Sequence, residues 1–119
     1  MKPKKAKKQR PNISLSLQDI EAILCSLPLI EYLETGSEAQ DTVNKALAVT
    51  ATQKIMSHNS NFVPNEIRII YTAIACAVNL ETFFPGAEID PNWKAEIQRH
   101  FFTLNRLYSL TKDYILADN

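Results

Sequence analysis

The segment Pro64–Phe84 constrains the fold of this chain more than any other stretch. It reads PNEIRIIYTAIACAVNLETFF, and at about 100° per residue its apolar side chains cover most of the helical circumference. Only Arg68, Thr72 and Asn79 form a narrow polar stripe. A helix that is apolar on most sides must be covered on most sides. We therefore predict that this segment is the central helix of an all-α domain, with Pro64 at its first position.

The segment from Ser16 to Gly36 predicts a first helix that is interrupted by proline. Ser16 is a suitable N-cap, and Leu17 to Leu27 carries apolar residues at spacings of three and four. Pro28 lacks a backbone amide, so it should kink or end the helix. Helix should resume from Leu29 to Thr35, and Gly36 should close it in the left-handed conformation.

Two further helices complete the predicted domain. The sequence S-E-A-Q at residues 37–40 is a capping box that opens a helix extending to Met56, with a narrow face of small residues. Asp90 and Pro91 are a cap and first residue for a last helix that reaches about Leu116. Its apolar stripe follows the spacing 4-4-3-4-3-4 and consists of Trp93, Ile97, Phe101, Leu104, Tyr108, Thr111 and Ile115. We predict a small four-helix bundle with a kinked first helix, formed by residues 14–119 as a single domain.

Residues 1–13 differ sharply in composition from the rest of the chain. The first ten contain six basic residues and no acid, whereas the remainder has seven basic and thirteen acidic residues. Such a segment cannot bury enough apolar surface to fold, so we predict a disordered basic N-terminal arm. Lys-rich runs are typical of nucleic-acid-binding tails and of nuclear localisation signals. The residues predicted to contact nucleic acid or another polyanion are Lys2, Lys4, Lys5, Lys7, Lys8 and Arg10. A solubilising terminus without a dedicated partner is the alternative.

A candidate partner-binding surface lies on the polar side of the last predicted helix. Phe102 falls opposite the centre of the apolar stripe, between Arg99 and Arg106. An exposed aromatic ring flanked by arginines resembles the composition of binding hot spots. We predict that Arg99, Phe102 and Arg106 contact a protein partner or a second copy of the chain. The alternative is that Phe102 is covered within its own chain, by the N-terminal region or by Phe62.

No motif in the sequence predicts catalysis, a cofactor or a metal. Two glycines are too few for a glycine-rich phosphate loop, and neither G-x-S-x-G nor S-x-x-K occurs. Cys25, Cys76, His58 and His100 share no metal-ligand spacing. The aromatic residues of the last helix are interpreted as core. We expect no catalytic residue, no cofactor, no metal and no small-molecule substrate.

The sequence also predicts location and class of function. Two cysteines within apolar helical runs indicate reduced, buried thiols, and neither a secretory signal nor a membrane span is recognised. We expect an intracellular, cytoplasmic protein, or a nuclear one if the source is eukaryotic or viral.

The first hypothesis for the function is a non-enzymatic regulator, adaptor or inhibitor that binds another macromolecule or itself. The second is a nucleic-acid-associated accessory protein that binds phosphates through the arm. An enzyme, which would need a polar cleft, is third.

Overall fold

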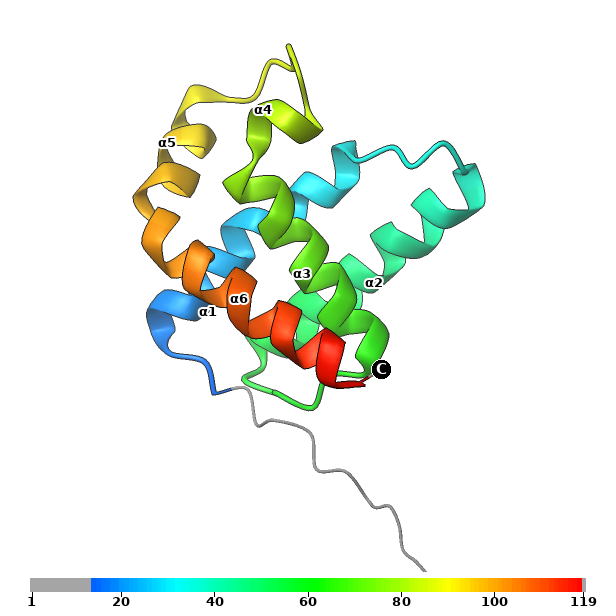
Figure 1. The fold of residues 1–119 in the computed structure, drawn as a ribbon, viewed down its shortest axis with the longest axis vertical. Coiled ribbons are helices and arrows are strands. Elements are labelled where there is room, and N and C mark those ends of the chain that lie inside the picture. The colour runs from blue at the N-terminus through cyan, green and yellow to red at the C-terminus, as the bar shows by residue number, and fades with distance from the viewer. Residues whose placement is uncertain (1–13, 119) are drawn as a thin grey trace, which may run out of the picture.

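The computed structural model of the chain describes residues 14–118, and within that range the protein is helical and has no strand (Figure 1). The predicted arm, residues 1–13, lies outside the described residues. The elements in chain order are α1 (Leu17–Ser26), the 3-10 helix η1 (Leu27–Tyr32), α2 (Glu38–Met56), α3 (Pro64–Val78), α4 (Leu80–Phe83), α5 (Pro91–Arg99) and α6 (Phe101–Asp118). The all-α prediction is confirmed.

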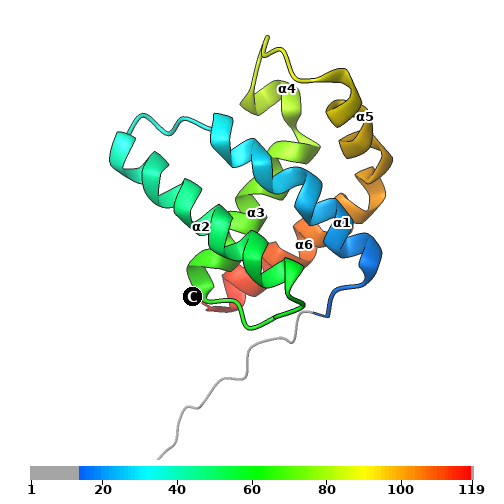
Figure 2. The same ribbon diagram turned by 180° about the vertical axis from the view of Figure 1, so that it is seen from behind.

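Helix α3 is the centre of the fold, as its sequence predicts. It packs against α1, η1, α2 and α6, and Figures 1 and 2 show it passing through the middle of the molecule. Arg68 and Asn79 are exposed and Thr72 is half-buried, so the polar stripe faces outward. The side chains that α3 buries are Glu66, Ile67, Ile69, Ile70, Ala73, Ile74, Ala75, Cys76 and Ala77.

The first helix begins at the predicted cap, and its α-helical part ends close to the predicted proline. Ser16 Oγ accepts a hydrogen bond from the Asp19 amide at 3.1 Å, and Asp19 Oδ2 accepts one from the Ser16 amide at 3.0 Å. The α-helix ends at Ser26, and Pro28 lies in the first turn of η1. The α-helix predicted from Leu29 to Thr35 does not form. The chain continues past the proline as a 3-10 helix that ends at Tyr32. Gly36 does adopt a positive φ of 90°, but beyond the end of η1.

Helix α2 packs less closely than its pattern predicts. Ser37 Oγ accepts a hydrogen bond from the Gln40 amide at 3.2 Å, which confirms the predicted cap. Only Ala51 and Ile55 are buried, whereas Val43 in the first half is 50% exposed. Figures 1 and 2 show the first half of α2 projecting from the rest of the molecule. The expected small-residue face is therefore used only toward the C-terminal end of the helix.

Two of the four predicted helices are each divided, so the described residues form six α-helices. Asn79, with φ −135° and ψ 49°, separates α3 from α4. His100, with φ −98° and ψ 17°, separates α5 from α6. The second break changes which side chains face inward. His100 is buried, whereas Phe101, predicted to lie in the core stripe, is 47% exposed.

Candidate partner-binding surface

Two adjacent phenylalanines are exposed in the first turn of α6. Phe102 is 88% exposed, the highest value among the exposed large hydrophobic side chains of residues 14–118. Its ring meets that of Phe101 edge to face, with the centroids 6.2 Å apart. Phe102 is exposed because it lies opposite the buried side of α6, as predicted. Phe101 joins it because the break at His100 turns residue 101 outward.

Arg99 extends this exposed surface at the end of α5. Its side chain is 68% exposed, and Nη2 lies 2.5 Å from Glu96 Oε2. The two residues are one helical turn apart on the solvent side of α5, where such a pair adds little to stability. The guanidinium therefore remains accessible to solvent, two residues before Phe101 in the chain.

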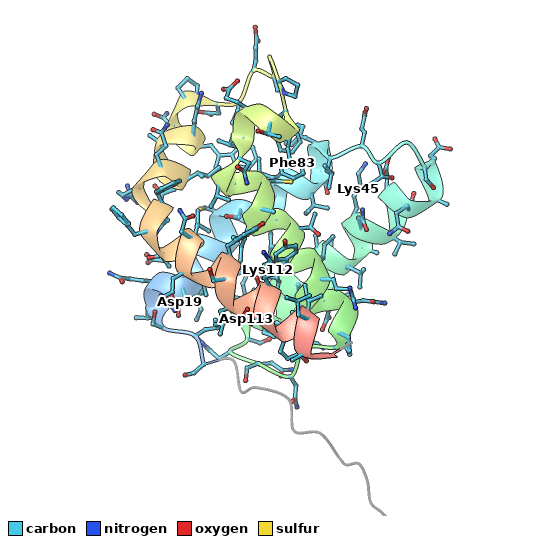
Figure 3. All side chains as sticks on the ribbon, in the orientation of Figure 1. Asp19, Lys45, Phe83, Lys112 and Asp113 are labelled. Carbon is cyan, nitrogen blue, oxygen red and sulfur yellow. The ribbon has the colours of Figure 1, made fainter. Side chains whose placement is uncertain are left out.

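Arg106 has a structural partner that the sequence pattern did not reveal. Its guanidinium pairs with the carboxylate of Asp19, which is only 3% exposed. This contact joins α6 to the start of α1, where Figure 3 labels Asp19. The Arg106 side chain is still 57% exposed, so part of it faces solvent. Arg106 is one of the three predicted site residues, and it also has a structural role: it attaches α6, the helix that carries Phe102, to α1.

The intramolecular covers predicted for Phe102 are not found among the described residues. Phe62 packs against the hydrophobic core instead, where it lines a hollow with Leu15, Ile20 and Ile55. The other predicted cover, the N-terminal region, lies outside the described residues up to Ile13, as do the six basic residues of the arm. Within residues 14–118, the Phe101–Phe102 pair is left open to solvent.

Burial suppresses the reactivity of the two thiols. Burial raises the pKa of the Cys76 thiol to about 11, and burial is also the main cause that raises the pKa of Cys25. Both cysteines are free and stay protonated near neutral pH, which makes them weak nucleophiles. His100 Nε2 lies 3.4 Å from Glu96 Oε2 without a hydrogen bond. Across residues 14–118, no group of three or more His, Cys, Asp or Glu side chains could hold a metal ion.

The helices formed by residues 14–118 also bear on membrane insertion. None of them is both long enough and apolar enough to span a bilayer.

Comparisons with protein-family models, with curated proteins and with solved structures gave no match for this chain. The sequence pattern placed Phe101 in the apolar stripe of the last helix. Its exposure would have been predictable only if the sequence had indicated the break at His100.

Proposed function

We propose that this protein is a non-enzymatic binding protein, and that Arg99, Phe101, Phe102 and the exposed part of Arg106 form its contact surface. This set is called the Phe102 surface below. The protein would act as a regulator, adaptor or inhibitor. In this proposal the domain works as a four-helix bundle, in which α3 with α4 and α5 with α6 each count as one bent unit.

The observation that carries the proposal is the exposure of Phe102. The Phe102 side chain is 88% exposed, so it adds nothing to the core and leaves a large aromatic surface available to a partner. Aromatic and arginine side chains are enriched where binding energy concentrates. The Asp19–Arg106 pair fixes α6 on α1, so the rings are presented by a rigid element and lose little freedom on binding.

Substituting Phe102 by glutamate should abolish association through the Phe102 surface without unfolding the protein. A hot-spot aromatic contributes about 2 kcal/mol or more, so affinity should fall by at least about thirtyfold. The side chain is already in water, so the thermal midpoint should change little. A photo-crosslinking amino acid at position 102 would capture the partner, and light scattering would detect a second copy.

Leu116→Glu is the matched control, since Leu116 is 61% exposed near the other end of α6. It introduces the same charge on the same helix outside the Phe102 surface. The control should keep full binding and full crosslinking from position 102. If position 102 captures nothing and Phe102→Glu leaves every association unchanged, the Phe102 surface is not the contact site.

The second candidate function is phosphate binding by the arm, which we propose to be a disordered tail over residues 1–13. It rests on the six basic residues within the first ten. Neutralising Lys4, Lys5, Lys7 and Lys8 to glutamine should remove a mobility shift of duplex DNA or RNA. For the intact chain, log affinity should fall against log salt with a slope of about −5 if all six charges engage. An intact chain that shifts neither nucleic acid at low salt would contradict this candidate.

A further inference from the structure

A groove with three aromatic walls opens between η1 and the loop that joins α4 to α5. Its volume is about 280 Å³. Tyr32 comes from η1, Phe84 follows α4, and Trp93 belongs to α5, so three separate segments meet here. These elements lie at the top of the molecule in Figures 1 and 2. We call this the aromatic groove; it is lined by Leu29, Tyr32, Phe84, Ala87, Glu88, Ile89, Asp90 and Trp93.

The Trp93 ring of the groove is held in place, and the Tyr32 ring beside it remains open to solvent. Trp93 Nε1 donates a hydrogen bond to the backbone oxygen of Cys25 at 2.7 Å, which fixes the indole on α1. The ring of Tyr32 lies 6.0 Å from that of Trp93 between centroids, tilted by 50°. Tyr32 is nevertheless 64% exposed. A ligand would therefore meet preformed aromatic walls, not a site that it must assemble.

Negative charge surrounds these rings. Glu88 and Asp90 line the groove, and Asp90 Oδ1 accepts a hydrogen bond from the Asn92 amide at 2.7 Å. An adjoining hollow of about 320 Å³ shares Phe84 and Glu88 and adds the carboxylate of Glu81. Among the residues lining the two hollows, the only cation is Lys94, 3.6 Å from Glu81. The groove therefore has a net negative charge.

Aromatic faces and carboxylates together select a cation that carries an apolar stem. A ring face attracts an ammonium group that lies within about 6 Å of its centroid, and tryptophan does so best. A carboxylate adds a charge-assisted hydrogen bond to the same group. A lysine side chain meets both requirements, because its methylene stem can lie on the apolar walls while its ammonium group reaches the rim.

We propose that the aromatic groove binds lysine side chains from residues 1–10 of a second copy of this chain. That segment contains five lysines and no acid, so its charge complements the groove. The association would be head to tail, because the arm of one copy enters the groove of the next. Such a contact closes into a ring or continues as a filament. It is independent of the Phe102 surface.

The position of Ser14 favours a second copy over the chain's own arm. Ser14 lines a hollow with His58 and Asn59, which precede α3, whereas the groove lies beyond the other end of α3 and α4. The fifteen residues of α3 alone measure about 22 Å. Lys7 and Lys8 are seven and six residues from Ser14, so they reach at most about 25 Å when fully extended. The four residues of α4 add about 6 Å to this length, so Lys7 and Lys8 fall short of the chain's own groove. Lys2, Lys4 and Lys5 reach it only if the arm before Ser14 is largely extended, a restriction that the arm of a second copy does not have.

Trp93 is the only tryptophan of the chain, so its fluorescence reports on this groove alone. The full-length chain with Lys4, Lys5, Lys7 and Lys8 replaced by glutamine would be titrated at low salt with a synthetic peptide of residues 1–12. We expect a saturable change in Trp93 emission that weakens in high salt. Tyr32→Ala together with Glu88→Gln in the protein should weaken binding at least tenfold, as should glutamine at the four lysines of the peptide.

Glu21→Gln is the matched control for charge, since Glu21 is exposed on α1 away from the groove, and it should bind the peptide normally. Light scattering of the unmodified chain should show a mass that rises with concentration. Both Tyr32→Ala with Glu88→Gln and the arm substitutions should return it to the monomer, whereas Phe102→Glu should not.

Four results would overturn the proposal. The first is no emission change with the peptide, and the second is equal binding of the glutamine peptide. The third is an unmodified chain whose emission matches the peptide-bound state while its mass stays monomeric at every concentration. That result would place the chain's own arm, not a second copy, in the groove. The fourth is loss of association in Phe102→Glu alone, which would assign self-association to the Phe102 surface instead.

Discussion

Replacing Ile74 by alanine should lower the free energy of unfolding by about 2–5 kcal/mol. Ile74 is 0% exposed in the middle of α3, the helix that contacts α1, η1, α2, α4 and α6. Removing its outer carbons leaves a cavity that the surrounding helices can fill only in part. For a chain of 119 residues the total stability is expected to be about 6–18 kcal/mol, so the loss is a large fraction. Urea unfolding followed by circular dichroism measures it.

Two variants on the same helix bracket this prediction. Ile74→Val keeps most of the side chain and should cost only about 0.5–1.5 kcal/mol. Arg68→Ala removes a side chain from the exposed stripe and should change stability by about 0.5 kcal/mol or less. If Ile74→Ala were as mild as Arg68→Ala, α3 would not be the centre of the core.

Features that depend on neighbours in sequence were predictable. The caps at Ser16, Ser37 and Asp90 are hydrogen bonds over two or three residues, so residue type and position suffice to predict them. The central position of α3 follows in the same way, because an all-round apolar pattern requires cover whatever supplies it. The end of α1 near Pro28 was predictable too, because the missing amide of a proline is a local property.

Features that depend on the assembled fold were not predictable. The apolar spacing of the last predicted helix continues through residue 100 without a sign of a break, yet His100 turns inward and divides it. Likewise, nothing local shows that α2 projects and leaves Val43 half exposed. The pairing of Asp19 with Arg106 spans 87 positions and appears only when α1 and α6 come together.

The aromatic groove shows the same limit for a candidate site. Trp93 lies in an apolar stripe at helical spacing, which is typical of core residues, and its indole is indeed half-buried. Its role as a wall emerges only because η1 brings Tyr32, and the loop after α4 brings Phe84, to the same place. By contrast, the exposure of Phe102 could be predicted from the sequence, since its isolation on a polar helix face is a local pattern.

Replacing Lys54 by methionine should destabilise the protein by about 3 kcal/mol at neutral pH. Glu66 is only 3% exposed, and its Oε1 lies 2.7 Å from Lys54 Nζ and 2.9 Å from the Val63 amide nitrogen. Lys54 also donates to the Asn61 backbone oxygen at 2.9 Å, so it ties α2 to the loop and to α3. Methionine keeps the length of the side chain but leaves a buried carboxylate without its ammonium partner.

The pH dependence of unfolding distinguishes this cause from lost packing. Burial alone would raise the pKa of Glu66, but hydrogen bonds from Lys54 and Val63 outweigh it, so the pKa lies below its ordinary value of 4.5. In the unmodified protein this carboxylate therefore stabilises fully above about pH 4.5 and loses its contribution as pH falls through the lower folded pKa. In Lys54→Met, burial should dominate and raise the pKa of Glu66. The stability deficit of this variant relative to the unmodified protein should therefore shrink as pH falls from 8 toward 5.

Adding Glu66→Gln to Lys54→Met removes the buried charge and should restore part of the stability at neutral pH. A deficit that stays constant with pH, or a double variant no more stable than Lys54→Met, would show that packing and not charge is responsible.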